Sequence, residues 1–181
     1  IDHTLVDDMW VPNHVLETDS LWDGAPWPGG VVPYAFDANT VSPSQQVMTR
    51  RAMAEIEGVC GVTFVPWTSG PNYLFIRENP NSTTVSNSSV GMQPVPQFLN
   101  IAEEHWNARF VIVHELMHAL GFMHEHQRAD RNLYVTINWN AIDPFCVGGC
   151  TGNFALSNSQ MVGGYDFESV MHYQQDAFGF G

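Results

Sequence analysis

Short apolar runs are spread through the N-terminal half of the chain, and their composition predicts strands. A strand is predicted to begin at Val31 in "GGVVPYAF". β-Branched and aromatic residues predict further strands at 62–67, 72–78 and 98–102. The intervening segment "NPNSTTVSNSSVG", residues 79–91, is mostly polar and is predicted to be a loop.

Two further stretches have the signals of helices. Ser42 is a candidate N-cap, Pro43 suits the first helical position, and Gly58 suits the end, so these residues bracket one helix. A second helix is predicted from about Arg109 to Leu120. Strands combined with two long helices predict an α+β fold built on a mixed sheet. Residues 1–26 have no sustained period and are predicted to form an extended N-terminal arm.

Composition and charge exclude several classes of protein. The chain has 181 residues, of which 44% are hydrophobic, so it is long enough to bury a sizeable core. It contains no run of eighteen apolar residues, and we expect no membrane span. The net charge of -13, with only six basic residues, argues against a nucleic-acid partner because little could neutralise phosphates. We expect a monomer.

The three cysteines, Cys60, Cys146 and Cys150, cannot all pair within the chain. Cys146 and Cys150 flank "VGG", which is flexible enough for a small disulfide loop. A zinc site is the alternative for this pair, but no second pair follows it, so we favour the disulfide. A disulfide would place the protein in an oxidising, extracellular environment, and we expect secretion.

The candidate chemistry is concentrated in "HELMHALGFMHEH", residues 114–126. On a helix, His114 and His118 lie on one face, one turn apart, and can share a metal ion. Gly121 is predicted to end the helix, so that a turn can return His124 to the same ion. Three imidazoles suit Zn²⁺ and leave a fourth position open, as in catalytic zinc sites.

Glu115 is rotated about 100° from His114 on the helix, so its carboxylate is placed beside a shared ion. Zinc lowers the pKa of water to about 7, and Glu115 can move that water's proton to a leaving amine. The alternative is that these histidines are ordinary polar side chains. The glycine and third histidine at fixed spacing argue against it for the three ligands, whereas His126, His3, His14 and His105 are assigned no metal role.

With these residues in place, the chain resembles the astacin family of metzincin zinc metalloendopeptidases. The motif HExxHxxGxxH is followed by Glu125 within "HEHQRADR", where other metzincins such as matrixins and reprolysins usually carry Ser or Asp. A second segment, "YDFESVMHYQQDAF", is similar to the Met-turn of astacins. The resemblance implies that Met171 forms an apolar floor beneath the zinc. It also implies that Tyr173 is an additional zinc ligand that can move to stabilise the oxyanion.

The resemblance also implies a two-lobed, metzincin-like catalytic domain over residues 27–181, with an irregular lower lobe. Residues 94–102 would carry an edge strand to which extended substrate adds. Glu125 would be a buried structural carboxylate, bonded to the free N-terminus in mature relatives. Family members continue past the Met-turn into a C-terminal helix, so the resemblance implies that the C-terminal part is missing.

The N-terminal arm has a looser resemblance of its own. The stretch "TLVDDMW" is similar to the family's pro-segment motif, and it puts Asp8 at the position of an aspartate that occupies the fourth zinc site as an inhibitory ligand. A solvated acidic arm is the alternative.

We therefore predict a secreted zinc endopeptidase that acts on proteins or peptides. The alternatives are another metzincin, a latent zymogen form, or a zinc-binding interaction module without turnover.

Overall fold

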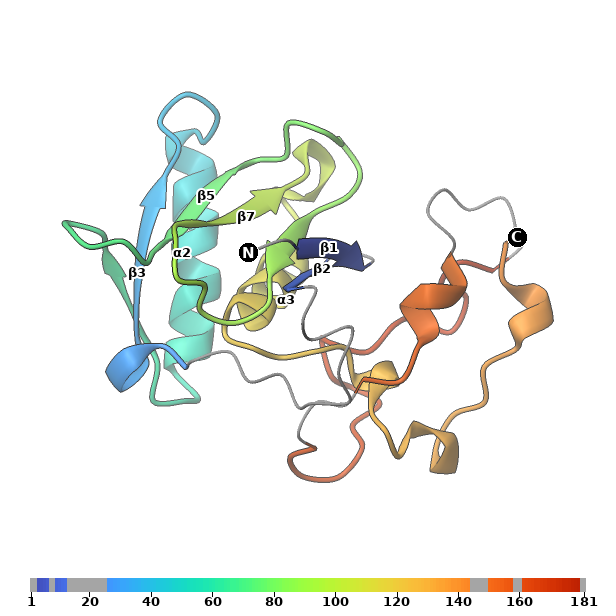
Figure 1. The fold of residues 1–181 in the computed structure, drawn as a ribbon. Coiled ribbons are helices and arrows are strands. Elements are labelled where there is room, and N and C mark those ends of the chain that lie inside the picture. Colours follow the sequence, from blue (N-terminus) through green and yellow to red (C-terminus); the bar gives the residue numbers. More distant parts are fainter. Residues whose placement is uncertain (1–2, 7–8, 13–25, 144–149, 158–160, 180–181) are drawn as a thin grey trace. The chain divides into compact units, whose positions relative to one another are not determined.

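The computed structural model describes residues 3–6, 9–12, 26–143, 150–157 and 161–179. These residues divide into two compact units. We call residues 24–122, with the short segment 8–10, the sheet unit, and the remainder, chiefly residues from Met123 onward, the loop unit. Figure 1 shows that the labelled strands and helices belong to the part of the chain before Met123. None of the described helices is long and apolar enough to cross a membrane.

One mixed sheet contains all the named strands. Its order is β1-β2-β6-β7-β5-β3-β4. The strands are β1 (His3–Val6), β2 (Met9–Pro12), β3 (Val31–Phe36), β4 (Thr63–Pro66), β5 (Leu74–Glu78), β6 (Asn87–Ser89) and β7 (Gln97–Ile101). The pairs β3·β4, β3·β5, β5·β7 and β2·β6 are parallel, whereas β6 and β7 are antiparallel. The predicted strands near Val31 and at 62–67, 72–78 and 98–102 are confirmed.

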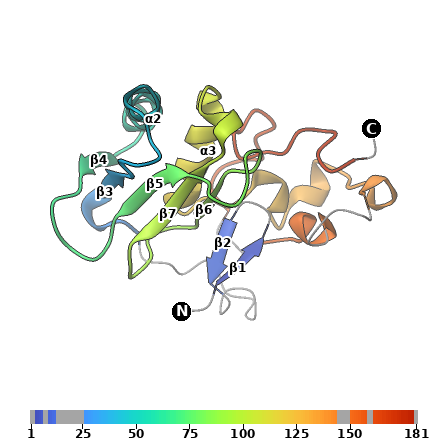
Figure 2. The ribbon, with the colours of Figure 1, turned by 90° about the horizontal axis from the view of Figure 1, so that it is seen from above.

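Two helices cover one face of this sheet (Figure 2). The first, α2 (Pro43–Glu57), begins with a capping box, in which Ser42 accepts from the backbone N–H of Gln45 and Gln45 reaches back to the N–H of Ser42. The second, α3 (Arg109–Ala119), lies beside it. Both helices were predicted from the sequence, and together with the mixed sheet they confirm the α+β class.

The core of the sheet unit lies between this sheet and these helices. It includes fully buried aliphatic residues from both strands and helices, for example Ile76 of β5, Leu99 of β7 and Leu116 of α3. Trp27 joins it and donates from its indole N–H to the carbonyl of Ala119 at 2.8 Å, which ties the segment before β3 to the end of α3. The position of α3, and of the histidines that it carries, is therefore determined by a continuous apolar core.

Two expectations about the sheet were wrong. The polar segment 79–91 is not all loop, because β6 (Asn87–Ser89) lies within it and pairs with β7. Residues 94–102 do not form an edge strand, because β7 is hydrogen-bonded on one side to β6 and on the other to β5. The side chains of β6 are polar but buried, and hydrogen bonds such as Asn100 to Asn87 at 2.7 Å replace the apolar pattern that marks an ordinary strand.

The loop unit has little regular structure. Its helical segments are short 3-10 helices, at Glu125–Gln127, Arg131–Leu133, Trp139–Ala141 and Cys150–Phe154; the sheet unit has others at Pro28–Gly30 and Glu103–His105. A small apolar cluster of Ile142, Cys150 and Phe154 is extended by Ile137, Tyr173 and Phe178. The expectation of an irregular second part of the molecule agrees with this description.

Candidate metal centre

Helix α3 supplies the first two histidines of the site. His114 and His118 are one turn apart, and their Nε2 atoms are separated by 3.0 Å. Two imidazole nitrogens bound to one tetrahedral zinc at about 2.0–2.1 Å would be roughly 3.3 Å apart, so the observed spacing fits a shared ion. His118 is fully buried, while His114 is partly exposed.

The tautomer of His118 is determined by the residues that end the helix. Gly121 has a φ of 107°, which favours glycine, and the chain turns so that the carbonyl of Phe122 lies 2.7 Å from Nδ1 of His118. A carbonyl can only accept, so Nδ1 carries the proton and Nε2 keeps its lone pair for a metal. The sequence predicted that Gly121 ends the helix, but it gave no sign that the carbonyl of Phe122 orients the ring of His118.

His124 completes the group. One ring nitrogen from each of His114, His118 and His124 lies within 4.8 Å of the others. All three belong to one continuous segment of eleven residues, 114–124. Neutral imidazole is a good zinc ligand, and three of them with no carboxylate or thiolate match the donor set of a catalytic zinc site. Among the residues that the structure describes, no other group of three His, Cys, Asp or Glu side chains is as suitable.

Glu115 follows His114 on α3, and only 1% of its surface is exposed. A buried carboxylate is costly unless it has polar or charged neighbours, so its presence next to the first histidine is informative. The neighbouring position on the helix keeps it off the line between the two imidazoles.

Within the loop unit, Tyr173 packs against His124, with ring centroids 4.7 Å apart. Its hydroxyl is buried and has no hydrogen-bond partner among the described residues. Met171 is 3% exposed, and its carbonyl accepts from the backbone N–H of Glu125 at 2.9 Å. This bond joins the Met-turn segment to the residue that follows the third histidine.

His126 is stacked on Tyr173, with ring centroids 3.8 Å apart, and its Nε2 donates to the carbonyl of Asn153 at 3.0 Å. Burial, together with the neighbouring His124, lowers the pKa of His126 from 6.5 to about 3. The ring is therefore neutral at pH 7. It is not a member of the three-histidine group, as expected.

Glu125 is only partly buried, with its side chain 16% exposed. Its Oε1 accepts from the backbone N–H of Asp166 at 2.9 Å and lies 3.5 Å from Nη1 of Arg128. The N-terminal amine, its expected partner in mature relatives, lies outside the described residues.

Asp8 and Cys146 also lie outside the described residues, so an inhibitory role for Asp8 and the pairing of Cys146 with Cys150 stay predictions. Cys150 is disulfide-bonded, and Cys60 is an exposed free thiol.

Arg128 is a structural residue that the sequence argument missed. It is 7% exposed, and two of its nitrogens each lie 3.0 Å from a carboxylate oxygen of Asp130. It also donates to the carbonyls of Val162, Gly163 and Gly164. In the sequence, Arg128 stood out only as part of the motif "HEHQRADR", on which the family resemblance rests, and the motif gave it no structural role.

A second missed contact holds the residue next to Tyr173. The hydroxyl of Tyr165 lies 2.7 Å from Nε2 of His172, whose Nδ1 lies 2.6 Å from the carbonyl of Tyr173. Because that carbonyl can only accept, Nδ1 donates to it and Nε2 accepts from the phenol. The phenol and imidazole therefore fix the backbone beside Tyr173.

A model of the astacin peptidase family matches residues 22–180. Mouse astacin-like metalloendopeptidase is 36% identical over 157 residues, which are 84% of this chain and 34% of that protein. Zinc metalloproteinase nas-14 of Caenorhabditis elegans is 34% identical over 84% of this chain and 30% of its own length. The chain therefore spans about a third of these curated relatives.

Among solved structures, the hatching enzyme zinc-protease high choriolytic enzyme 1 from the medaka fish, Oryzias latipes, is similar with a TM-score of 0.76. The two are 30% identical, and the match covers 90% of this chain and 80% of that one. Myroilysin, at 20% identity and a TM-score of 0.53 over 82% of this chain, shares the fold.

Proposed function

The chain belongs to the astacin family, and on that premise we propose that it is a zinc-dependent endopeptidase. The observation that carries the proposal is the three-histidine group, whose ligand nitrogens lie within 4.8 Å of one another. The relatives are named as metalloproteinases or metalloendopeptidases, which agrees with a hydrolytic role. These names favour a peptidase over a zinc-binding interaction module.

His114, His118 and His124 would hold the zinc ion. When bound, zinc polarises a peptide carbonyl and lowers the pKa of water to about 7. The hydrogen bond from Nδ1 of His118 to the carbonyl of Phe122 keeps the Nε2 lone pair available at this ligand. Three protein ligands leave room for water or substrate, which a structural site with four protein ligands would not.

Glu115 is proposed as the general base and acid. It accepts a proton from the attacking water and then returns that proton to the leaving amine nitrogen. Its near-complete burial next to His114 supports this role, because a buried carboxylate is costly and such groups are found at functional sites.

Tyr173 is proposed as the donor that stabilises the oxyanion, and as an additional zinc ligand before substrate binds. Its buried hydroxyl, which has no partner among the described residues, supports both roles, and the packing against His124 places it beside the proposed ligand. Met171 is proposed as the apolar floor, in keeping with its burial.

Glu125 is proposed as a structural carboxylate, supported by its bonds to the Asp166 N–H and Arg128.

The substrates are proposed to be proteins or peptides. A Cys146–Cys150 disulfide is proposed as well, and the disulfide at Cys150 supports a secreted protein, because such bonds persist in oxidising compartments.

The test is a comparison of the zinc-loaded chain with Glu115→Gln on an unfolded protein substrate. We expect the substitution to lower kcat/KM by about 10²–10⁴, the usual contribution of a general acid–base group. Bound zinc, measured by atomic absorption, should stay the same, because Glu115 is not a ligand. Glu103→Gln, a substitution of an exposed carboxylate, is the matched control and should leave activity unchanged. Equal cleavage by Glu115→Gln and the wild type would exclude this mechanism.

A regulatory role of the N-terminal arm is the second proposal. Met9 and Trp10 of β2 pair in parallel with Ser88 and Ser89 of β6, so part of the arm occupies a strand edge that an extended peptide could otherwise use. We expect Asp8→Ala, or removal of residues 1–20, to raise peptidase activity. Asp2→Ala is the control for Asp8→Ala. Unchanged activity after both modifications would show that the arm does not hold the enzyme latent.

A further inference from the structure

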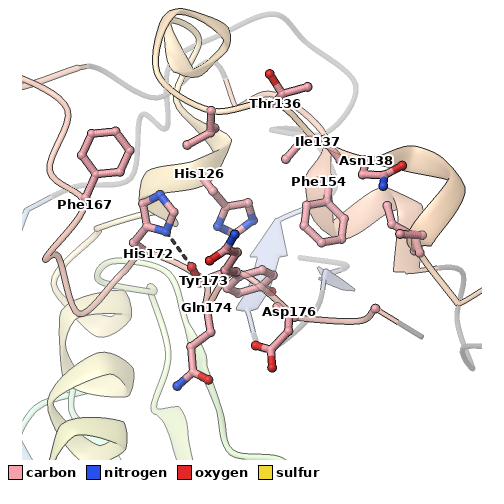
Figure 3. A pocket seen from close by; sticks show the side chains of 16 residues that line it. His126, Thr136, Ile137, Asn138, Phe154, Phe167, His172, Tyr173, Gln174 and Asp176 are labelled. Atoms are coloured by element: carbon pink, nitrogen blue, oxygen red, sulfur yellow. Dashed lines mark hydrogen bonds between the residues drawn. The ribbon is translucent and has the colours of Figure 1, made fainter. Parts of the chain in front are cut away.

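The loop unit contains a cavity of about 800 Å³, and Tyr173 is the one residue assigned to the metal centre among its lining residues. Figure 3 shows its lining side chains, with His126 and Tyr173 near the centre, Phe154 and Asp176 to one side of them and Phe167 on the other. All sixteen lining residues come from the single span 126–179, so the cavity belongs to the loop unit alone.

Part of the lining is aromatic. Phe154 lies edge-on to Tyr173, with ring centroids 5.9 Å apart, and 5.6 Å from the ring of His126. Ile137 and Ile142 add aliphatic surface. These walls can bury the apolar stem of a long side chain and can offer ring faces to a planar cation.

The charge of the lining has one sign. No lysine or arginine is among the sixteen residues, and Asp176 is the single carboxylate. A cationic occupant would be stabilised by Asp176, whereas an acidic one would find no counter-charge among these residues.

The cavity is next to the proposed chemistry through Tyr173. This residue lines the cavity and packs on His124, so an occupant would lie one side chain away from a proposed ligand. A peptide whose backbone reaches Tyr173 could therefore place the side chain of a residue near the scissile bond in this cavity.

We propose that this cavity receives a substrate side chain beside the scissile bond and selects a cationic one, arginine or lysine, over an acidic one. The inference rests on the proposed peptidase function. Asp176 pairs with the cation at the rim, the aromatic wall packs on its stem and head, and the protein's net charge of -13 disfavours acidic peptides.

The first experiment is cleavage of a peptide library by the zinc-loaded chain, with the cleavage sites read by mass spectrometry. We expect arginine and lysine to be enriched at one position flanking the cut, and Asp and Glu to be depleted there. Two peptides that differ only by arginine or leucine at that position then give kcat/KM values. Enrichment of acids, or no charge preference at any flanking position, would overturn the inference.

Variants identify the responsible group. Asp176→Asn should lower kcat/KM for the arginine peptide by about three- to five-fold, the effect of an accessible ion pair, and leave the leucine peptide within about two-fold. Glu168→Gln, which removes an exposed carboxylate of the same unit that does not line the cavity, is the matched control. A similar loss for both peptides would assign Asp176 a merely structural role and overturn the inference.

A binding measurement separates this inference from the proposed function. In the Glu115→Gln chain, N-acetyl-arginine amide should shift the NMR signals of the Asp176 and Ala177 amides, and N-acetyl-glutamate amide should not. If these shifts occur but the wild type cleaves no substrate, the peptidase proposal is rejected, whereas the preference of the cavity for a cationic side chain is supported. Equal shifts with both compounds, or none with either, would overturn the inference.

Discussion

The sheet unit and the loop unit are stabilised in different ways. In the sheet unit, buried aliphatic residues from strands and helices form one cluster, and the backbone is paired in the sheet and helices. In the loop unit the apolar cluster is small. Its loops are also joined by the buried Arg128, which bonds to a carboxylate and to three backbone carbonyls. Two proposed zinc ligands are therefore held by a helix in a packed core, while His124 and Tyr173 lie in loops and pack on each other.

This difference predicts which parts of the proposed site tolerate substitutions. A proposed ligand on α3 is displaced only if the core is disrupted, because helix and sheet pack together. The loop residues that line the cavity can vary with less effect on folding, which suits a part of the molecule that determines specificity.

The largest expected effect on stability comes from the core of the sheet unit. Leu99 of β7 is fully buried, so Leu99→Ala should lower the free energy of unfolding by about 2–5 kcal/mol through lost burial and a cavity. Its neighbour Phe98 points to the opposite face and is 43% exposed, so Phe98→Ala should cost less than half as much. Chemical denaturation measures both. Equal costs would contradict the contrast between a packed and an open face.

A smaller effect on stability is expected from a comparison of two glycines with nearly the same φ. Gly30 in the sheet unit has a φ of 70° and Gly163 in the loop unit has a φ of 71°. A Cβ at Gly30 would lie 2.5 Å from the carbonyl oxygen of Gly61, whereas one at Gly163 would meet nothing within 4 Å.

Alanine at either glycine has the cost of a positive φ, and Gly30→Ala should add roughly 1–3 kcal/mol of overpacking to it. Thermal unfolding of the two variants gives the difference. A larger loss for Gly163→Ala would show that the loop unit is the more tightly packed of the two.

The smallest expected effect concerns the polar network of the loop unit. The hydrogen bond from Arg128 lowers the pKa of Asp130, so the carboxylate stabilises the fold above its unfolded-state pKa near 3.8 and loses this effect as pH falls through the lower folded-state pKa. At pH 7, Asp130→Asn should increase amide hydrogen exchange in the loop unit. This difference from the wild type should shrink as the pH is lowered below about 4.

Glu55→Gln is the control for this measurement. Glu55 forms an ion pair with Arg109 at 3.2 Å, but both side chains are more than half exposed, so little change is expected. An Asp130→Asn effect that is the same at pH 7 and pH 3 would mean that packing, and not the charge of Asp130, holds these loops.

Most of the local structure, and the local part of the proposed site, could be predicted from the sequence. The bounds of α2 and α3, the strands near Val31 and at 62–67, 72–78 and 98–102, and the turn at Gly121 follow from caps, breakers and periodicity. The spacing of His114, His118 and His124 needed only helix geometry and one turn. These features depend on residues within a few positions of one another, and their energies are therefore visible in a short window of sequence.

The features that join distant segments of the chain depend on tertiary contacts and could not be predicted from the sequence. The tertiary structure showed that β6 exists and that β7 is an interior strand, because a polar strand is stabilised by cross-strand hydrogen bonds that no local pattern reveals. It brought Tyr173 to His124, the carbonyls of residues 162–164 to Arg128, and Asp176 to the wall of a cavity that also contains His126. Each of these contacts is selected by the packing of the whole chain, which compares many possible non-local pairings, and not by the residues on either side of it.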